Sequence, residues 1–242
     1  MICLSFWKRY YPVYALVIAG VITAALLADR AVDFAAQVMA QSRSAPLVLV
    51  LDPGHGGEDG GAAVQNLTEA ELNLQIGLRL RDLCRLCGIP VVMTRQEDRA
   101  IYSPEAQTIS EKKVSDLKNR VKLVADTPGA VLLSIHQNMY EASKYRGAQV
   151  FFAPTEGSRE LAELIQGAVI GQLQPENHRA VKPAGSVYLL QHIRCAGVLV
   201  ECGFLSNPEE RTLLTQADYQ KKLACAILSG VTGYLRLSPE EA

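Results

Sequence analysis

Two histidines and two glutamates stand where polar side chains follow or interrupt apolar stretches. His55 follows one apolar run, in the glycine-dense segment DPGHGGEDGG, and His136 ends another. Glu69 stands at the predicted start of a helix, and Glu201 lies near the end of a third apolar run. Two histidines and one carboxylate form the ligand set of many catalytic zinc sites, which keep a fourth position open for water. A second carboxylate beside such a site can take a proton from the water and give it to a departing amine.

Each of these residues also has an ordinary structural explanation. A histidine at a strand end can satisfy backbone groups, the helix dipole favours a glutamate in a first turn, and a strand-end carboxylate can pair with an arginine. A phosphate-binding loop is disfavoured because Asp59 stands where the pattern G-x-G-x-x-G, started by Gly54 and Gly56, requires its third glycine. The chain contains no H-E-x-x-H. A zinc site would therefore need ligands that converge from separate elements.

The elements that would position these residues alternate between strand and helix. Apolar runs predict strands near 47–52, 89–94, 130–136, 147–153, 186–190 and 196–203, and helical periodicity predicts helices near 69–87, 114–126, 157–173, 208–216 and 218–236. This alternation predicts an α/β fold with a mostly parallel, twisted, six-stranded sheet and helices on both faces. Ligands of such sheets collect beyond the carboxyl ends of the strands, which is where both histidines and Glu201 would lie. The polar segment 95–115 is expected to be a long loop.

The N-terminal segment has the pattern of a membrane anchor. Residues 10–28 carry no charge, and Lys8 and Arg9 precede them. This predicts a cytoplasmic N-terminus at 1–9, a transmembrane signal anchor at 10–28, a linker at 29–45 and an extracytoplasmic catalytic domain at 46–238. A cleaved signal peptide is the alternative, because residues 38–40 resemble a cleavage site. Both interpretations place the domain outside the cytoplasm.

Composition narrows the possible partners. The formal net charge is −1, and the lysines and arginines are scattered along the chain. Proteins that bind nucleic acid usually carry a basic stripe, so nucleic acid is not expected as a partner.

Six cysteines in an exported protein raise the question of disulfides. Cys84 and Cys87 recur at the helical spacing of the neighbouring leucines, which predicts that both lie on the core face of a helix. The separately placed Cys195, Cys202 and Cys225 stand in apolar surroundings. We expect these cysteines to be small buried side chains rather than a disulfide framework or a zinc site.

Several ordered motifs resemble those of one enzyme family. These are DPGHGGEDGGA, EAELNL, the dipeptide Thr94-Arg95, SIHQN and VECGFLSNPEE. In order and spacing they resemble the zinc-dependent N-acetylmuramoyl-L-alanine amidases of the amidase-3 type, over about residues 48–235. The segments KKVSDLKNRVKLV, GSVYLLQH and DYQKKLACAI are similar to the germination-specific members found in endospore-forming bacteria.

The resemblance implies a zinc-exopeptidase-like (phosphorylase/hydrolase-like) fold and one Zn²⁺ per chain. His55, Glu69 and His136 would be the ligands, and Glu201 the catalytic carboxylate. The substrate would be peptidoglycan, cleaved between the lactyl group of N-acetylmuramic acid and L-alanine. Family members often have Glu-Lys where this chain has Glu69-Ala70, which leaves Glu71 as an alternative ligand. Glu69 is preferred because Glu71 fits a capping box with the preceding threonine.

Other polar residues are weaker candidates. Asn138 could bind substrate or support a zinc ligand, and Asp52 could hydrogen-bond a histidine that binds the metal. Arg95 and Arg120 could hold carboxylates of the substrate or of the protein. His192, after a predicted strand, could reach the substrate cleft or lie at the surface.

The similarity to germination-specific amidases also implies a setting. The product would feed muramic lactam formation in the spore cortex, the enzyme would lie between the forespore and mother-cell membranes, and a lipoprotein could be an activating partner. Two other functions fit the residues. One is a zinc carboxypeptidase acting on wall peptides, and the other is a non-catalytic protein that binds zinc or peptidoglycan.

Overall fold

In this computed structural model of the 242-residue chain, the described residues are Thr23, Arg30 and 46–237. The chain divides into two compact units, 1–45 and 46–242, and the elements below belong to the second. Apart from Thr23 and Arg30, the predicted anchor and linker lie outside the described residues. Within the part of the chain that the structure describes, no helix combines the length and the apolar character needed to cross a membrane.

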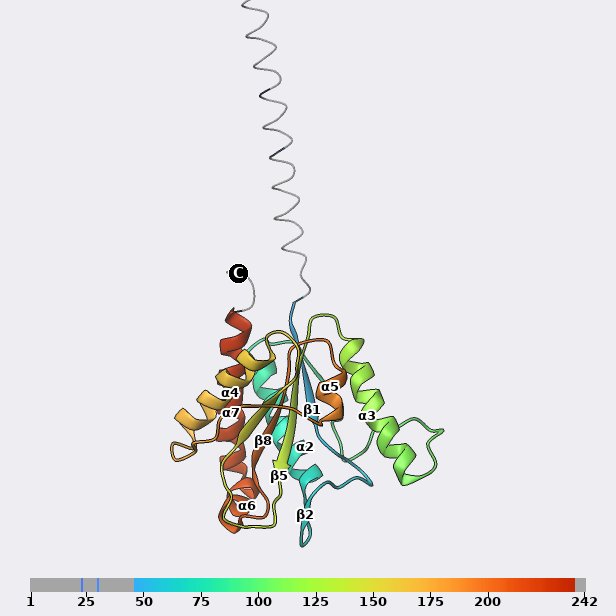
Figure 1. The fold of residues 1–242 in the computed structure, drawn as a ribbon, viewed down its shortest axis with the longest axis vertical. Coiled ribbons are helices and arrows are strands. Elements are labelled where there is room, and N and C mark those ends of the chain that lie inside the picture. The colour runs from blue at the N-terminus through green and yellow to red at the C-terminus, as the bar shows by residue number, and fades with distance from the viewer. Residues whose placement is uncertain (1–22, 24–29, 31–45, 238–242) are drawn as a thin grey trace, which may run out of the picture. The chain divides into compact units, whose positions relative to one another are not determined.

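A six-stranded sheet forms the centre of the domain (Figure 1). Its strands are β1 (Val48–Pro53), β4 (Val91–Met93), β5 (Ala130–Asn138), β6 (Gln149–Phe152), β7 (Lys182–Pro183) and β8 (Gly197–Phe204). The order is β4-β1-β5-β8-β6-β7, and every pairing is parallel except that of β6 with β8. A two-stranded ribbon, β2 (Ala63–Val64) and β3 (Leu67–Thr68), precedes the first helix. The predicted mostly parallel sheet is confirmed.

Helices cover both faces of the sheet. They are α2 (Glu69–Leu86), α3 (Ile109–Ala125), α4 (Ser158–Gln172), α5 (Tyr188–His192), α6 (Pro208–Thr215) and α7 (Ala217–Leu237). Alternate residues of a strand point to opposite faces. Leu49 and Leu51 accordingly belong to the core that also contains residues of α2, α4 and α7, whereas Val50 packs with residues of α3 and α5. Figure 1 shows these two groups of helices on opposite sides of β1, β5 and β8.

Two element predictions were wrong. Residues 188–192 form the helix α5 instead of a strand, and the sixth strand is the short β7. A short apolar run does not distinguish a strand from a buried helical turn, and here Leu189 and Leu190 belong to a core cluster that also contains Val124 of α3. The loop predicted for 95–115 ends earlier because α3 begins at Ile109.

Helix ends follow local side-chain chemistry. Thr108 and Glu111 form a capping box at the start of α3. Asn207 accepts hydrogen bonds from the backbone N–H groups of Glu209 and Glu210, which confirms the cap expected before α6. Capping therefore fixes where α3 begins, a start that helical periodicity alone placed five residues too late.

The five described cysteines are all free. Cys84 and Cys202 are buried as predicted, and burial raises the pKa of the Cys84 thiol to about 11. Cys87 and Cys225 are exposed, which contradicts the prediction that they belong to the core. Cys87 is the cap residue after the last turn of α2, so the helical periodicity that buries Cys84 no longer applies to it. Cys195 is half-buried.

Candidate active site

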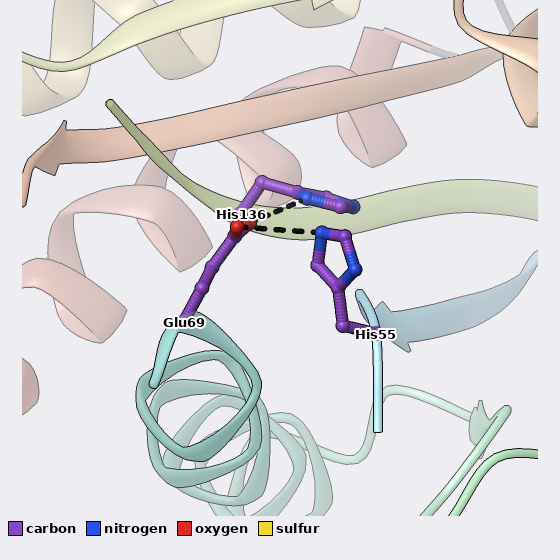
Figure 2. Close-up of side chains that lie close together, drawn as sticks. All are labelled: His55, Glu69 and His136. Carbon is purple, nitrogen blue, oxygen red and sulfur yellow. Dashed lines mark hydrogen bonds and ion pairs between the residues drawn. The ribbon is translucent and has the colours of Figure 1, made fainter. Parts of the chain in front are cut away.

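His55, Glu69 and His136 converge at the carboxyl end of the sheet (Figure 2). The Nε2 atom of His55 lies 3.3 Å from one carboxylate oxygen of Glu69, and the Nδ1 atom of His136 lies 2.8 Å from the other. One potential ligand atom from each residue lies within 4.8 Å of those of the other two. The three residues come from the turn after β1, the start of α2 and the end of β5.

The turn after β1 sets the orientation of the His55 ring. His55 itself has a φ of 61°, a left-handed conformation that is uncommon outside glycine, and Gly56 and Gly57 continue the turn with positive φ. The turn closes through hydrogen bonds in both directions between the backbones of Gly56 and Asp59. This brings the Asp59 carboxylate 3.0 Å from His55 Nδ1. Because Nδ1 is engaged there, Nε2 is the nitrogen that faces Glu69.

Glu69, the first residue of α2, is held by three donors. Its carboxylate accepts hydrogen bonds from the backbone N–H of Ala62 at 2.9 Å and of Gln137 at 3.2 Å, and from Asn73 Nδ2 at 3.4 Å. Asn73 also donates to the carbonyl of Gly54. These hydrogen bonds tie Glu69 to the end of β1 and to β5, beside both histidines.

Glu71 does not join this cluster. Its side chain is exposed and accepts a hydrogen bond from Gln75, while its backbone N–H donates to Thr68. Of the two glutamates that the sequence left open, the structure brings Glu69 to the histidines.

Two glycines leave the space that the ligands occupy. A Cβ atom added to Gly54 would lie 2.1 Å from Nε2 of His136, and one added to Gly61 would lie 2.6 Å from a carboxylate oxygen of Glu69. Gly61 also has a φ of 67°. Any side chain at either position would displace a residue of the cluster.

Glu201 lies beside the cluster on β8, in register with His136 on β5. Its Oε2 atom is buried and has no hydrogen-bond partner among the described residues. Burial raises the pKa of Glu201 to about 7; the charge of His136 opposes this rise and that of Glu69 adds to it. The arrangement combines three residues that could hold a metal ion with a neighbouring carboxylate whose raised pKa suits proton transfer.

Arg120 and Asp52 form a buried ion pair that contacts the backbone of the turn after β1. Arg120 Nη1 lies 2.5 Å from Asp52 Oδ1, and Arg120 also pairs with Asp116 and donates to the backbone carbonyl of His55. Asp52 further accepts hydrogen bonds from the hydroxyls of Thr94 and Ser134. Burial alone would raise the pKa of Asp52, but the charge of Arg120 and these hydrogen bonds lower it. Asp52 therefore pairs with an arginine and two hydroxyls rather than with a histidine.

Arg95 is also a structural residue of the turn. Its guanidinium, which is 1% exposed, donates to the backbone carbonyls of Pro53, Gly54 and Ala70. Arg95 thus joins the end of β1 to the first turn of α2, and it holds peptide carbonyls instead of the carboxylates that the sequence suggested.

Comparison with known proteins identifies the family. Residues 49–233 match the family model of the amidase-3 N-acetylmuramoyl-L-alanine amidases. The chain belongs to this family. Such an enzyme hydrolyses the amide that joins N-acetylmuramic acid to L-alanine in peptidoglycan, and the cluster supplies the groups that hydrolysis of an amide needs.

Individual relatives agree with this assignment. The germination-specific N-acetylmuramoyl-L-alanine amidase of Bacillus subtilis is 37% identical over 188 residues, which cover 77% of this chain and 79% of the relative. The amidase LytC of the same organism is 32% identical, covering 78% of this chain and 35% of LytC. Among solved structures, the CwlD amidase from Clostridioides difficile, in complex with the GerS lipoprotein, superposes with a TM-score of 0.77 at 39% identity, covering 79% of this chain and 100% of that one.

The two remaining sequence candidates lie at opposite ends of the amidase sheet. Asn138 ends β5 and lines a cavity of about 440 Å³ beside Gln149, the residue of β6 in register with Glu201. His192 lines a different cavity with Gly129 and Ala130, at the amino end of β5, and its ring stacks on Tyr188. The structure therefore keeps Asn138 near the site and separates His192 from it.

Sequence reasoning missed two residues of the amidase site, Asp59 and Asn73. Asp59 follows His55 by four residues in a turn whose glycines permit a reversal, and Asn73 follows Glu69 by four residues on one helix face. Both spacings are visible in the sequence. However, the sequence does not show that the turn folds Asp59 back onto His55, or that Asn73 faces Glu69.

The donor set of the amidase site fits zinc. Two imidazole nitrogens and a carboxylate are the donors that zinc prefers, and both histidines already turn a nitrogen toward Glu69. Burial would raise the pKa of Glu69, but hydrogen bonds to His136 and His55 lower it. Burial would lower the pKa of His55, and its hydrogen bonds to Glu69 and Asp59 raise it. A carboxylate kept charged between two imidazoles is the state in which it binds a divalent cation.

Proposed function

We propose that this amidase depends on one zinc ion held by His55, Glu69 and His136, and that Glu201 moves the proton. The observation that carries the proposal is that three ligand residues from separate elements converge, with the half-buried Glu201 on the neighbouring strand. When bound, zinc would acidify a water molecule and polarise the lactyl carbonyl of the substrate.

The side chains of the protein divide the remaining work. Glu201 takes a proton from the attacking water and delivers it to the alanine nitrogen as the amide breaks. Its buried Oε2 atom has no protein partner in the described structure, so nothing there competes for that proton. Asp59 orients the ring of His55, and Asn73 holds Glu69 against the end of β1.

The Glu201→Gln variant tests this division of labour. We expect muropeptide cleavage to fall by about 10²- to 10⁴-fold, the usual contribution of a general acid–base group, while zinc content stays at one per chain. Product masses report cleavage, and elemental analysis reports zinc. Glu71→Gln is the matched control and should keep full activity, because Glu71 faces solvent on the same helix as Glu69. Unchanged cleavage by zinc-loaded Glu201→Gln would remove Glu201 from the mechanism.

The same digestion separates the two rival functions. A zinc carboxypeptidase would shorten the stem peptide from its far end, and a non-catalytic binder would release nothing. Only an amidase liberates an intact stem peptide that begins with L-alanine. The measured product masses distinguish all three.

We further propose that residues 10–28 anchor the enzyme in a membrane and that it acts in the spore cortex, where its product feeds muramic lactam formation. The uncharged segment and its basic flank support the anchor. Similarity to the germination-specific amidase of Bacillus subtilis supports the setting, and the complex of the Clostridioides difficile enzyme with GerS supports a lipoprotein partner. Spores that lack the protein should contain no muramic lactam, and normal lactam content would refute this setting.

A further inference from the structure

A basic and aromatic cavity of about 440 Å³ lies at the end of β8, the strand that carries Glu201. Its walls include two cationic side chains, Arg179 and Lys182, and the aromatic rings of Tyr140, Tyr145 and Phe204. Asn138, two residues after His136 at the end of β5, lines the same space. The cavity therefore lies at the carboxyl ends of β5 and β8, the edge of the sheet where the amide would be cleaved.

Gln149 connects the cavity to the catalytic strand. It lies in register with Glu201 on the adjacent strand, and neighbouring strands are about 4.8 Å apart. The side-chain oxygen of Gln149 accepts a hydrogen bond from Arg179 Nη2 at 2.7 Å, and its nitrogen donates to the carbonyl of Ala180. Arg179 is therefore hydrogen-bonded to a residue of β6 that lies directly beside Glu201 on β8.

Arg179 is fixed in place but forms no direct ion pair within residues 46–237, although its charge acts at longer range on Glu201 and Glu210. Its guanidinium lies 5.0 Å from the centre of the Phe204 ring, and its Nε atom is buried without a hydrogen-bond partner. Among residues 46–237, no ion pair joins Arg179 or Lys182 to a carboxylate within 4.0 Å; the pairs found there involve other cations. Because Gln149 holds Nη2 and the guanidinium forms no ion pair of its own, its Nη atoms, rather than the buried Nε, are suited to binding a carboxylate.

A second cavity lies near Asp59, close to the His55 side of the cluster. It differs from the first because its cationic side chains are paired with carboxylates. Its two lysines are already paired, Lys112 with Glu58 and Lys113 with Asp59. Each lysine of that cavity is therefore paired directly with a carboxylate, whereas neither Arg179 nor Lys182 forms such a pair within residues 46–237. An anionic part of the substrate would therefore be drawn to the Arg179 cavity.

We propose that Arg179 and Lys182 form a specificity subsite for a carboxylate of the stem peptide. The proposal rests on the amidase function, because it assigns the peptide side of the cleaved bond to this cavity. The glycan lacks a charge that these cations would bind, whereas the stem peptide carries free carboxyl groups. Arg179 binds the carboxylate through its planar fork, and Lys182 adds a second charge at the cavity rim.

Three synthetic substrates test the subsite with the full chain loaded with zinc. The parent is N-acetylmuramoyl-L-alanyl-γ-D-glutamyl-L-lysine; one derivative has the glutamate α-carboxyl as an amide, and the other has the C-terminal carboxyl as an amide. For the wild type we expect one amidation to raise KM by about 10- to 100-fold, the loss expected for a charge-assisted hydrogen bond. The sensitive derivative tells which carboxylate is bound.

Variants then assign the effect to the subsite. With Arg179→Gln, the KM for the parent substrate should rise to the value that the wild type shows for the sensitive amidated derivative. Amidation should then cause no further change in KM. The value of kcat should change less than KM. Arg179→Lys should recover part of the preference because it retains the charge without the fork. Arg159→Gln is the matched control, since Arg159 is exposed on α4 and pairs with Glu163; it should behave as the wild type.

The possible failures are distinct. If the wild type cleaves none of the three substrates, the amidase function itself is refuted. If the wild type cleaves all three with the same KM, or if Arg179→Gln keeps the wild-type preference, the subsite is refuted while the amidase function stands.

Discussion

At the scale of single residues, the site depends on how its ligands are held as much as on their identity. The carboxylate of Asp59 contacts Nδ1 of His55. Three N–H groups donate hydrogen bonds to the carboxylate of Glu69. Such partners fix the ring or carboxylate in the orientation that the proposed zinc ion would require. Glycines at 54 and 61 contribute by leaving room.

Removing the Asp59 carboxylate should weaken zinc binding without unfolding the domain. We expect Asp59→Ala to lower zinc affinity by about 10- to 100-fold, because the His55 ring loses the partner that orients it. Competition with a chelator measures the affinity. Glu58→Ala, a neighbour whose carboxylate pairs only with Lys112, serves as the control. Equal zinc affinity in Asp59→Ala and the wild type would show that the contact has no role in binding.

Filling the space at Gly54 should have a similar effect for a steric reason. The added methyl of Gly54→Ala would overlap the ring of His136 at 2.1 Å, so the ring must move and zinc affinity should fall at least about tenfold. Gly171→Ala is the control, because a Cβ there meets no atom within 4 Å. Isothermal titration with zinc compares the two; wild-type affinity in Gly54→Ala would contradict the close packing of His136 against the turn.

At the scale of elements, buried arginines join the segments that carry the ligands. Arg95 connects the carbonyls at the end of β1 to α2, and Arg120 connects α3 to β1. Each guanidinium supplies several donors in a fixed plane, so one side chain can satisfy carbonyls from more than one element. The turn that carries His55 is therefore clamped between two helices.

Loss of the Arg95 clamp should destabilise the whole domain. We expect Arg95→Ala to lower the free energy of unfolding by about 3 kcal/mol or more, because three buried carbonyls lose a charged donor. Arg81→Ala, which removes a partly exposed pair with Asp82, should cost less than about 1 kcal/mol. Urea unfolding measures both. If Arg95→Ala lowered the free energy of unfolding no more than Arg81→Ala does, water would be replacing the hydrogen bonds that Arg95 donates to the three carbonyls.

At the scale of the whole molecule, one sheet gathers residues that are far apart in the chain. β1, β5 and β8 are parallel neighbours, so their carboxyl ends meet at one edge of the sheet. This edge brings together His55 and Glu201, which are 146 positions apart in the sequence. The buried pair of Asp52 and Arg120 sits at this edge and links the stability of the sheet to pH.

Acid should weaken the domain partly through Asp52. The pKa of Asp52 is lower in the folded chain than its unfolded value of about 4, so its contribution to stability is present above pH 4 and is lost as the pH falls through the folded pKa. The wild type should therefore lose more unfolding free energy than Asp52→Asn between about pH 5 and pH 2. Urea unfolding at several pH values gives both curves, and parallel curves would exclude Asp52 as the cause.

Local signals in the sequence were sufficient for the main strands and helices, for the glycine-rich turn and for placing His55, His136 and Glu201 near strand ends, whereas the fold chose Glu69 over Glu71. Those signals are apolar periodicity, helix caps, and polar residues at strand ends. They were insufficient for α5, because a run as short as Val187 to Leu190 is compatible with either a strand or a helix. The core cluster that α5 shares with α3 and the sheet exists only in the folded domain, so the short run itself could not decide between the two.

The contacts of each side chain, in contrast, emerged only from the folded domain. The fold pairs Asp59 rather than Asp52 with His55, gives Arg95 to backbone carbonyls, and places His192 at the far end of the sheet. Such partnerships depend on which elements lie side by side and on the direction in which each side chain leaves the backbone. Those two quantities arise from packing of the whole chain, so no local stretch of sequence contains them.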